Sequence, residues 1–345
     1  MSRRKATNPS ESGKQQLLSP DFAPLPPSPG HVSGLFAMDR GLFLLPSRIG
    51  LDVTRRQAIG FISHAHMDHT AHHALALCTQ PTAKLVRHRL GNVTTKVMPL
   101  GEATEVAGIQ LTALPAGHIF GSAMVFAEHE KGSLLYTGDF RLGPSATAEE
   151  AQLRSADYLI MECTFGHPQY RLPPRETVIE MLLERIHAAL KRGATPVISA
   201  YVLGKSQEVT KILTSHGIPV LQHPDIYAIS LVYQEAGCDL GDFRPYTGRP
   251  IPGCAVIVPP RPVTPSVLPG AVHVEKFHVT GWAFNPKRRR SAPKDHWIPL
   301  SDHADFDQLI RAVEEVGPKT VFCTHGPKSF VEELRSRGHD ARWLE

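Results

Sequence analysis

Long apolar runs and paired cysteines are both missing from this chain of 345 residues. No run approaches the roughly 18 consecutive apolar residues that a membrane-spanning helix needs, which excludes an integral membrane protein of that kind. The five cysteines are odd in number, far apart and never arranged as Cys-x-x-Cys, which argues against a disulfide framework and against a thiolate zinc site. Segment 1–16 lacks the apolar centre of a secretory signal, so we expect a cytoplasmic protein.

Excess charge is also small, since the formal net charge is only +4 with histidine counted as neutral. One local excess lies at 285–294, which carries five cations and no acid. Because prolines bound this segment, we predict a loop rather than a helix. A solvated basic loop and a contact with a phosphate backbone are both compatible with it. Histidine, by contrast, is abundant at 19 residues.

The length fits two domains, or one large domain that carries an insertion. Segment 1–30 is rich in Ser, Pro, Gln, Lys and Arg and predicts a disordered tail. Short apolar runs at 34–165 predict a β-rich region, whereas strands and helices alternate after residue 165, as in a parallel α/β unit. The expected strands are 42–45, 59–63, 85–86, 109–114, 123–127, 134–136, 158–161, 196–200, 255–258, 320–324 and a final short one. The expected helices are 175–191, a second one ending at Ile212, 306–316 and 329–337.

A cluster of histidines and an aspartate follows the strand expected at 59–63. It reads His64-Ala65-His66-Met67-Asp68-His69. Side chains two residues apart share a face of an extended segment, so we expect His64 and His66 to bind one cation. A turn after them directs Asp68 and His69 to a second position. Imidazole and carboxylate ligands without thiolates favour a catalytic zinc or manganese site over a chance surface run of histidines.

Three further candidate ligands follow apolar strands and lie beside glycines, which let the backbone approach a site closely. They are His118 in Gly117-His118-Ile119, Asp139 in Gly138-Asp139-Phe140 and His325 in Thr324-His325-Gly326. Each alone is typical of an ordinary loop residue. Together they supply the ligands that a two-metal site still needs.

The order of these residues resembles the metallo-β-lactamase fold over essentially the whole chain after residue 30. The resemblance implies an α/β protein, an αββα sandwich with the metals at one edge of two facing sheets. It implies one divalent ion, Zn²⁺ or alternatively Mn²⁺, held by His64, His66 and His118, and a second held by Asp68, His69 and His325, with Asp139 bridging. Asp52 matches the early aspartate that orients a metal-bound histidine in this fold, although alone it reads as a turn residue.

Two more motifs resemble those of the β-CASP nucleases, a branch of this fold. They are Met161-Glu162-Cys163-Thr164-Phe165-Gly166 and Leu300-Ser301-Asp302-His303-Ala304-Asp305. The resemblance implies a compact β-CASP cassette at 166–295, inserted into a lactamase domain formed by 31–165 and 296–345. Within the branch the chain is most similar to the bacterial DNA ligase-associated exonucleases, through Gly41-Leu42-Phe43-Leu44, Thr164-Phe165-Gly166-His167-Pro168-Gln169-Tyr170 and Tyr201-Val202-Leu203-Gly204-Lys205-Ser206-Gln207.

The function that this resemblance implies is metal-dependent hydrolysis of phosphodiesters. We expect a DNA exonuclease of DNA repair that acts together with an ATP-dependent DNA ligase. Two cations would activate the water between them and clamp the attacking and leaving oxygens. We expect His303 to neutralise charge and protonate the departing oxygen, with Glu162 orienting it and with Asp139 and Asp52 completing the catalytic set. Capping of the helix at 306–316 is the plainer alternative for His303.

Substrate contacts are expected at Gly204, Lys205 and Ser206, where a strand passes into a helix. Backbone N–H groups at such a terminus attract phosphate, although an ordinary turn is the alternative. His72 and His73 are expected on the solvent-facing side of a helix after the metal motif, and the remaining histidines are expected not to be ligands.

Three alternative functions remain open. A ribonuclease of the RNA-processing group, similar to the mRNA 3′-end processing members, is the nearest, because a histidine in the last motif is also typical of RNA-cleaving members. A non-catalytic scaffold is disfavoured by the full set of ligands. A small-ester hydrolase is disfavoured by the motifs around Glu162 and His303.

Overall fold

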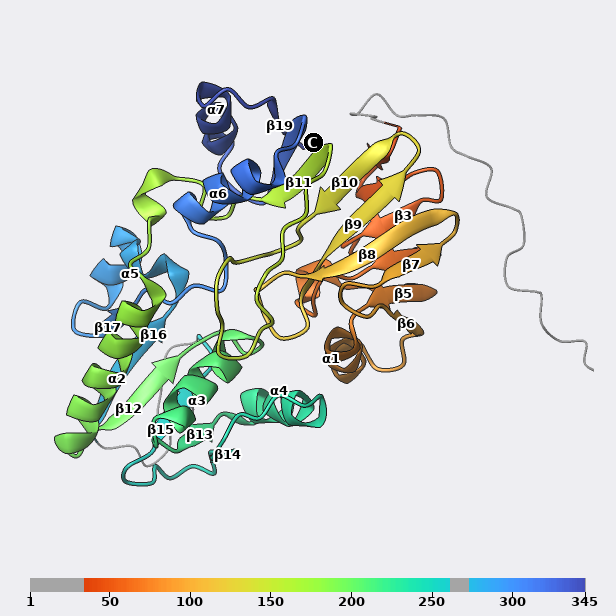
Figure 1. Ribbon diagram of the computed structural model, residues 1–345. Coiled ribbons are helices and arrows are strands. Elements are labelled where there is room, and N and C mark those ends of the chain that lie inside the picture. The colour runs from red at the N-terminus through yellow and green to blue at the C-terminus, as the bar shows by residue number, and fades with distance from the viewer. Residues whose placement is uncertain (1–33, 261–272, 345) are drawn as a thin grey trace, which may run out of the picture.

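A computed structural model describes residues 34–260 and 273–344. The tail expected at 1–30 lies outside the described residues. Three sheets organise the described part of the chain, two of which face each other and occupy the right of Figure 1. The third lies with its helices at the lower left.

The first sheet has six strands in chain order, antiparallel from β1 to β3 and parallel from β3 to β6. Its strands are β1 (Phe36–Met38), β2 (Leu42–Leu44), β3 (Ile49–Leu51), β4 (Ile59–Phe61), β5 (Leu75–Cys78) and β6 (Thr95–Val97). The short helix η1 (Met67–His69) follows β4 and carries part of the histidine motif. The motif therefore begins at the carboxyl end of a buried strand.

The second sheet has seven strands in the order β19-β18-β11-β10-β9-β8-β7. They are β7 (Ala103–Val106), β8 (Ile109–Pro115), β9 (Ala123–His129), β10 (Gly132–Tyr136), β11 (Tyr158–Glu162), β18 (Thr320–Thr324) and β19 (Ala341–Trp343). Strand β11 lies parallel between β10 and β18, with Glu162 opposite Thr324. This register brings the Glu162 motif beside His325, although the two are far apart in the sequence.

The inner faces of these two sheets form one apolar core, because Phe36, Leu44 and Phe61 of the first sheet pack with Val125 and Ile160 of the second. On the outer face of the second sheet lie the helices α6 (Phe306–Val316) and α7 (Ser329–Ser336), and on the outer face of the first lies α1 (Gln80–Leu90). Two facing sheets between helices confirm the predicted αββα sandwich.

The third sheet is parallel throughout, in the order β14-β13-β15-β12-β16-β17. Its strands are β12 (Thr195–Ser199), β13 (Val220–Gln222), β14 (Phe243–Pro245), β15 (Ala255–Val258), β16 (Val274–Val279) and β17 (His296–Ile298). The helices of this region are α2 (Arg175–Lys191), α3 (Lys205–Ser215), α4 (Pro224–Glu235) and α5 (Pro286–Ser291), with the short η2 (Pro168–Tyr170) and η3 (Gly281–Phe284). Strand β17 begins at His296, just past the expected end of the inserted cassette at residue 295. The assignment of 166–295 as a separate cassette stays a prediction.

Three sequence predictions of local structure are wrong. The strand expected at 85–86 is the middle of helix α1, which Thr79 caps by accepting a hydrogen bond from the N–H of Thr82. Its apolar residues Ala83, Leu85 and Val86 point together into the core, as in a helix. His72 and His73 do not lie on a helix, because an irregular segment leads directly into β5. His73 is buried there and accepts a hydrogen bond from the N–H of Gln57.

The loop expected at 285–294 is also wrong, since helix α5 begins at Pro286. Proline at the first helical position forms no clash and lacks only an N–H that would be unpaired there. Asn285 caps the helix by accepting hydrogen bonds from the N–H groups of Lys287 and Arg288. Within the described residues, no helix is long and apolar enough to cross a membrane.

Candidate metal centre and active site

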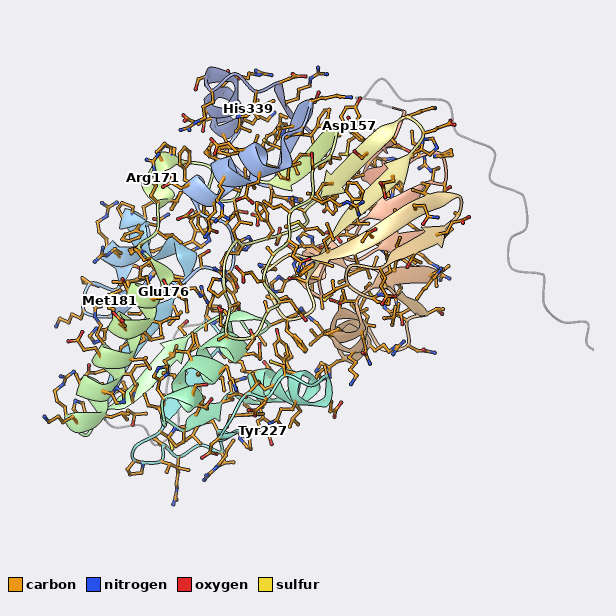
Figure 2. All side chains as sticks on the ribbon, viewed as in Figure 1. Asp157, Arg171, Glu176, Met181, Tyr227 and His339 are labelled. Atoms are coloured by element: carbon orange, nitrogen blue, oxygen red, sulfur yellow. The ribbon has the colours of Figure 1, made fainter. Side chains whose placement is uncertain are left out.

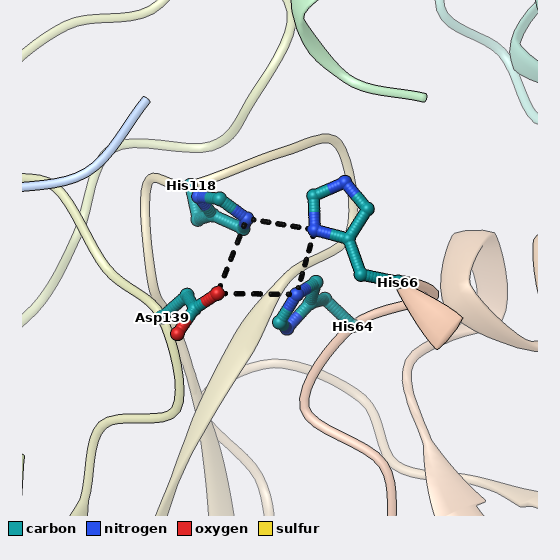
Figure 3. A group of neighbouring side chains, drawn as sticks. All are labelled: His64, His66, His118 and Asp139. Atoms are coloured by element: carbon teal, nitrogen blue, oxygen red, sulfur yellow. Dashed lines mark hydrogen bonds and ion pairs between the residues drawn. The ribbon is translucent and has the colours of Figure 1, made fainter. Parts of the chain in front are cut away.

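Five of the predicted ligands are brought together at one edge of the two facing sheets. The histidine motif follows β4, His118 follows β8 and Asp139 follows β10. The side chains of His64, His66, His118 and Asp139 point toward one another (Figure 3), and a nitrogen or oxygen of each lies within 4.8 Å of the others. His69 approaches the same point, with its Nε2 3.4 Å from Asp139 Oδ2.

The distances within this group suit a single cation. His66 Nδ1 lies 2.9 Å from His64 Nε2 and 3.2 Å from His118 Nε2. Asp139 Oδ2 lies 3.5 Å from His64 Nε2 and 3.8 Å from His118 Nε2. Three ring nitrogens and a carboxylate oxygen thus surround one point.

Each ring has an inner nitrogen, which faces the other ligands, and an outer nitrogen, which does not. The hydrogen bond of the outer nitrogen determines whether the inner nitrogen carries the proton or a free lone pair. His66 Nε2 donates to the carbonyl of Leu203 (3.1 Å) and His118 Nδ1 donates to the carbonyl of Asp302 (2.8 Å). His64 Nδ1 lies 2.9 Å from Ser63 Oγ. With their protons on the outer nitrogens, the inner nitrogens present lone pairs to one another, which is favourable only around a cation. The residues present therefore fit a divalent metal.

Burial supports the same protonation state. It lowers the pKa of His66 and of His118 to about 4, and together with the neighbouring histidines it holds the pKa of His64 well below its usual range. Burial raises the pKa of Asp139, but the cationic rings around it, His303 first, hold that pKa well below its usual value. Neutral imidazoles beside an ionised carboxylate are what a metal ion binds.

Asp52 organises this edge from behind the ligands. Its Oδ2 accepts hydrogen bonds from Tyr136 Oη (2.9 Å), Ser63 Oγ (2.6 Å) and His69 Nδ1 (2.9 Å). Ser63 Oγ in turn contacts His64, so a single carboxylate orients two candidate ligands. Gly138 is required opposite, because a Cβ there would lie 2.6 Å from Ser63 Oγ.

The second predicted ligand set is more open. Asp68 Oδ2 lies 4.0 Å from His69 Nε2 with 82% of its side chain exposed, and the His69 and His325 rings lie 5.9 Å apart. Burial lowers the pKa of His69, but Asp52 and Asp139 raise it to about 11. Asp52 and His325 both adopt positive φ, at 49° and 51°. Such strain in residues other than glycine is concentrated at functional sites.

His303 and Glu162 meet beside the metal ligands. His303 Nδ1 lies 2.8 Å from Glu162 Oε1, while Glu162 also accepts hydrogen bonds from the N–H of Phe140 (3.0 Å) and from Thr164 Oγ1. Burial lowers the pKa of His303, but the neighbouring carboxylates of Glu162 and Asp139 raise it to about 10, which favours the protonated ring. The cap of α6 is Asp305, which removes the alternative that His303 serves as the cap.

A cavity of about 390 Å³ opens onto these groups, and we call it the first cavity. Seventeen residues line it: His66, Met67, Asp68, His69, Arg89, Asp139, Thr164, Phe165, Tyr201, Lys205, Thr280, Gly281, Trp282, Ser301, Asp302, His303 and His325. Some of them belong to the part of the chain that forms the first two sheets, and the others belong to the part that forms the third sheet. Trp282 packs against Phe165 and Tyr170, with ring centroids 4.7 and 5.3 Å away, and so forms one wall.

The predicted phosphate-binding turn lies at this cavity, but its groups differ in what they offer. The N–H of Gly204 donates to Gln207 Oε1 and that of Ser206 to the carbonyl of Tyr201, so both are already used. Lys205 lines the first cavity, with its ammonium 3.3 Å from Glu208 and 3.7 Å from Asp302. Gly204, with φ 92°, allows close contact, since a Cβ there would lie 2.2 Å from Ile119.

Several site residues were not predicted from the sequence. Ser63 and Tyr136 act through hydrogen bonds to Asp52, and Thr164 and Asp302 line the first cavity. The available signals were the adjacency of Ser63 to His64 and the positions of Thr164 and Asp302 within the two β-CASP-like motifs. Among the other histidines, His339 lies near α7 at the outer edge of the molecule (Figure 2).

Comparison with known proteins identifies the family. Residues 27–200 match the β-lactamase superfamily domain, and residues 293–343 match the Zn-dependent metallo-hydrolase RNA specificity domain. The chain belongs to the metallo-β-lactamase superfamily. Its carboxyl-terminal match and its inserted third sheet identify it as a member of the β-CASP branch, whose members include metal-dependent nucleases.

Individual relatives agree with this family. A probable DNA ligase of Opitutus terrae is 38% identical over 87% of this chain, and the 5′ exonuclease Apollo of Gallus gallus is 28% identical over 76%. The chain spans only 30% of the first relative and 57% of the second. A solved protein of unknown function from Enterococcus faecalis matches 77% of this chain and 75% of its own, with a TM-score of 0.54 at 15% identity, which supports the fold alone.

Proposed function

We propose that the chain is a DNA exonuclease that hydrolyses phosphodiesters with two divalent cations and works in DNA repair together with an ATP-dependent DNA ligase. The observation that carries this proposal is the convergence of His64, His66, His118 and Asp139, with each outer ring nitrogen bonded, beside His303, whose Nδ1 is held by Glu162. The relative named as a probable DNA ligase supports DNA and a ligase as substrate and partner. The five free cysteines support action in the cytoplasm.

The proposed ligands are His64, His66 and His118 for one ion and Asp68, His69 and His325 for the other, with Asp139 between them. Zn²⁺ is the proposed ion and Mn²⁺ the alternative. When bound, such ions supply a strong nucleophile at neutral pH and offset the negative charge that develops on the phosphate. Asp52 and Ser63 hold the rings in place for this role.

His303 is the proposed acid. Its Nδ1 is held by Glu162, which leaves Nε2 to deliver a proton to the departing oxygen of the scissile phosphate. Its positive charge also stabilises the transition state. Lys205 lies on the same cavity and is proposed to contact a substrate phosphate, with Gly204 and Ser206 shaping the turn that carries it.

A ribonuclease is the second candidate, favoured by one observation. Residues 293–343, which contain His303 and His325, match a domain described by its RNA specificity. The site chemistry is the same for both sugars, so only the substrate separates the two functions.

The test is digestion of end-labelled DNA and RNA strands of the same sequence, in a series of Zn²⁺, Mn²⁺ and Mg²⁺. We expect mononucleotide release from DNA that chelation stops, and no release by Asp139→Asn. Equal or faster digestion of RNA would replace DNA with RNA as the substrate. No digestion of either strand at full metal content would refute the proposed hydrolase.

His303 has its own test. We expect His303→Ala to retain metal and to cut at least about a hundredfold more slowly, since a positioned acid contributes roughly 10²- to 10⁴-fold. The loss should shrink when the leaving oxygen belongs to a p-nitrophenolate, which needs no proton. An equal loss on both substrates would assign His303 to structure rather than to proton transfer.

A further inference from the structure

A second cavity of about 380 Å³ lies at the carboxyl edge of the third sheet. Its lining includes the residues that directly follow β12 and β16, together with side chains of α5 and β17. In open α/β sheets, ligands bind in the crevice outside the carboxyl ends of the parallel strands. The second cavity occupies that position.

The two cavities adjoin. Tyr201 and Thr280 line both cavities, so a linear polymer can extend across these two residues from His303 in the first cavity into the second cavity. Tyr201 is 45% exposed between the two cavities. An exposed aromatic ring of this kind is a surface on which a base stacks.

The second cavity is cationic. Lys276 and Arg288 line it, together with His278 and the single acid Asp295. The charge of Asp295 is already engaged, because its Oδ2 lies 2.8 Å from His278 Nε2, and His278 stacks on Trp297 with ring centroids 4.3 Å apart. Neither Lys276 nor Arg288 has an ion pair with any other described residue.

The same holds for the other cations of helix α5, which lies beside β16 and β17 (Figure 1), and for Lys294 shortly after it. Within the described residues, Lys287, Arg289, Arg290 and Lys294 also form no ion pair. On helices α6 and α7, by contrast, Arg311 pairs with Glu315 and Arg335 with Glu332. Unpaired cations gathered at a cavity attract a polyanion rather than stabilise the fold.

We propose that the second cavity binds the sugar-phosphate backbone of a single nucleic-acid strand whose end lies in the first cavity. Lys276 and Arg288 contact phosphates, and Tyr201 stacks one base between the cavities. The inference rests on the proposed function, because it assumes that the first cavity acts on a nucleic-acid end.

The test is binding of fluorescent 12-nucleotide DNA and RNA strands, measured by anisotropy in a chelator so that no cutting occurs. We expect Lys276→Gln/Arg288→Gln to bind at least about tenfold more weakly than the unmodified protein. The slope of log affinity against log salt should fall by about 1.4, since each contacted phosphate of a single strand contributes roughly 0.7. Metal-dependent cleavage of a dinucleotide, which fills only the first cavity, should not change.

Two control proteins make the result specific. Arg311→Gln/Arg335→Gln removes the same charge from α6 and α7 and should bind as the unmodified protein does. Lys276→Arg/Arg288→Lys keeps the charge and should retain the salt slope.

Tyr201→Ala should weaken binding at least about fivefold, whereas Tyr201→Phe should not.

The outcomes separate this inference from the proposed function. If the unmodified protein cuts DNA or RNA but Lys276→Gln/Arg288→Gln binds both strands normally, the second cavity is not a strand-binding site and the nuclease stands. Equal weakening of strand binding by Arg311→Gln/Arg335→Gln would show that binding depends only on net charge. It would refute the second cavity as a strand-binding site. A protein that neither binds nor cuts any strand refutes the proposed function itself.

Discussion

The candidate metal centre has a buried half, formed by His64, His66, His118 and Asp139, and an open half, formed by Asp68, His69 and His325. The fold holds the buried half more firmly than the open half. His64 and His118 are fully buried and only 11% of the Asp139 side chain is exposed, and the outer nitrogen of every ring in that half is bonded. In the other half, Asp68 is 82% exposed and His325 is also exposed, whereas His69 is buried and its Nδ1 is bonded to Asp52. The first half is therefore ordered by folding itself, whereas two of the three ligands of the second half are exposed.

This difference has an energetic consequence. A ligand set that is already ordered loses little side-chain entropy on binding a metal, whereas exposed ligands must be ordered by the ion. We therefore expect tight binding in the buried half and weaker, exchangeable binding in the open half. Both halves reach the first cavity, since His66 and Asp139 line it together with Asp68, His69 and His325.

Removing a ligand from the buried half should have the largest effect. We expect His118→Ala to lower the metal content of the chain and the nuclease rate by about 10³-fold or more, because a catalytic constellation fails as a unit. Metal analysis per chain and end-labelled digestion measure the two effects. A His118→Ala protein with full metal and undiminished activity would show that the buried half is not the metal site.

Removing a ligand from the open half should have a smaller effect. We expect His325→Ala to keep about one ion per chain and to cut roughly a hundredfold more slowly, with partial recovery in excess Mn²⁺. Titration of metal into the chelated protein should give one tight step in the variant and two in the unmodified chain. Loss of both ions in His325→Ala would mean that the halves are not independent.

Disturbing the support behind the buried half should have a moderate effect. Ser63 links Asp52 to His64, and loss of such a partner typically weakens metal binding about 10- to 100-fold. We therefore expect Ser63→Ala to bind Zn²⁺ that much more weakly. Ser47→Ala is the matched control, because its hydroxyl bonds only the Ala107 carbonyl at the surface. Equal affinities in the two variants would contradict the role of Ser63.

The sequence predicted elements with a clear apolar period. Helix α6 has the predicted bounds at 306–316, and α2 has them at 175–191, because each has one apolar face. Helix α4 was not predicted, because both of its sides are apolar: Ile229, Val232 and Tyr233 pack toward α1 while Ile226 packs into the third-sheet core. Helix α5 was predicted as a loop because its proline lies at the one helical position that tolerates it.

For the site, spacing alone predicted the four residues of the motif after β4, since they are local. The convergence of His118 and Asp139 with them depends on how the strands pair, and it was predicted only through strand ends and family resemblance. The resemblance predicted that Asp52 orients a ligand histidine and that Glu162 orients His303, and both bonds are present, but the remaining supporting bonds were not predicted. Tyr136 reaches Asp52 across 84 positions and the Asp302 carbonyl reaches His118 across 184, so no local pattern encodes either contact.

The last expected effect is on stability rather than on metal binding or cleavage, and it lies at Glu208. Burial raises its pKa, but Arg175 and Lys205 lower it to about 2 from a usual value of 4.5. Because the folded-state pKa is the lower one, the ion pairs stabilise the fold above pH 4.5, and this contribution of up to about 3 kcal/mol is lost as the pH falls from 4.5 to 2.

We therefore expect Glu208→Gln to be less stable at pH 7, where Arg175 and Lys205 lose their partner, and to show a flatter fall of unfolding free energy below pH 4.5. Urea unfolding at a series of pH values measures both effects. Glu176→Gln is the matched control, since Glu176 lies exposed on the neighbouring face of α2 (Figure 2). If both variants keep the acid dependence of the unmodified chain, the charge on Glu208 does not stabilise the fold through Arg175 and Lys205. The buried half of the metal centre is then held in place by its own hydrogen bonds.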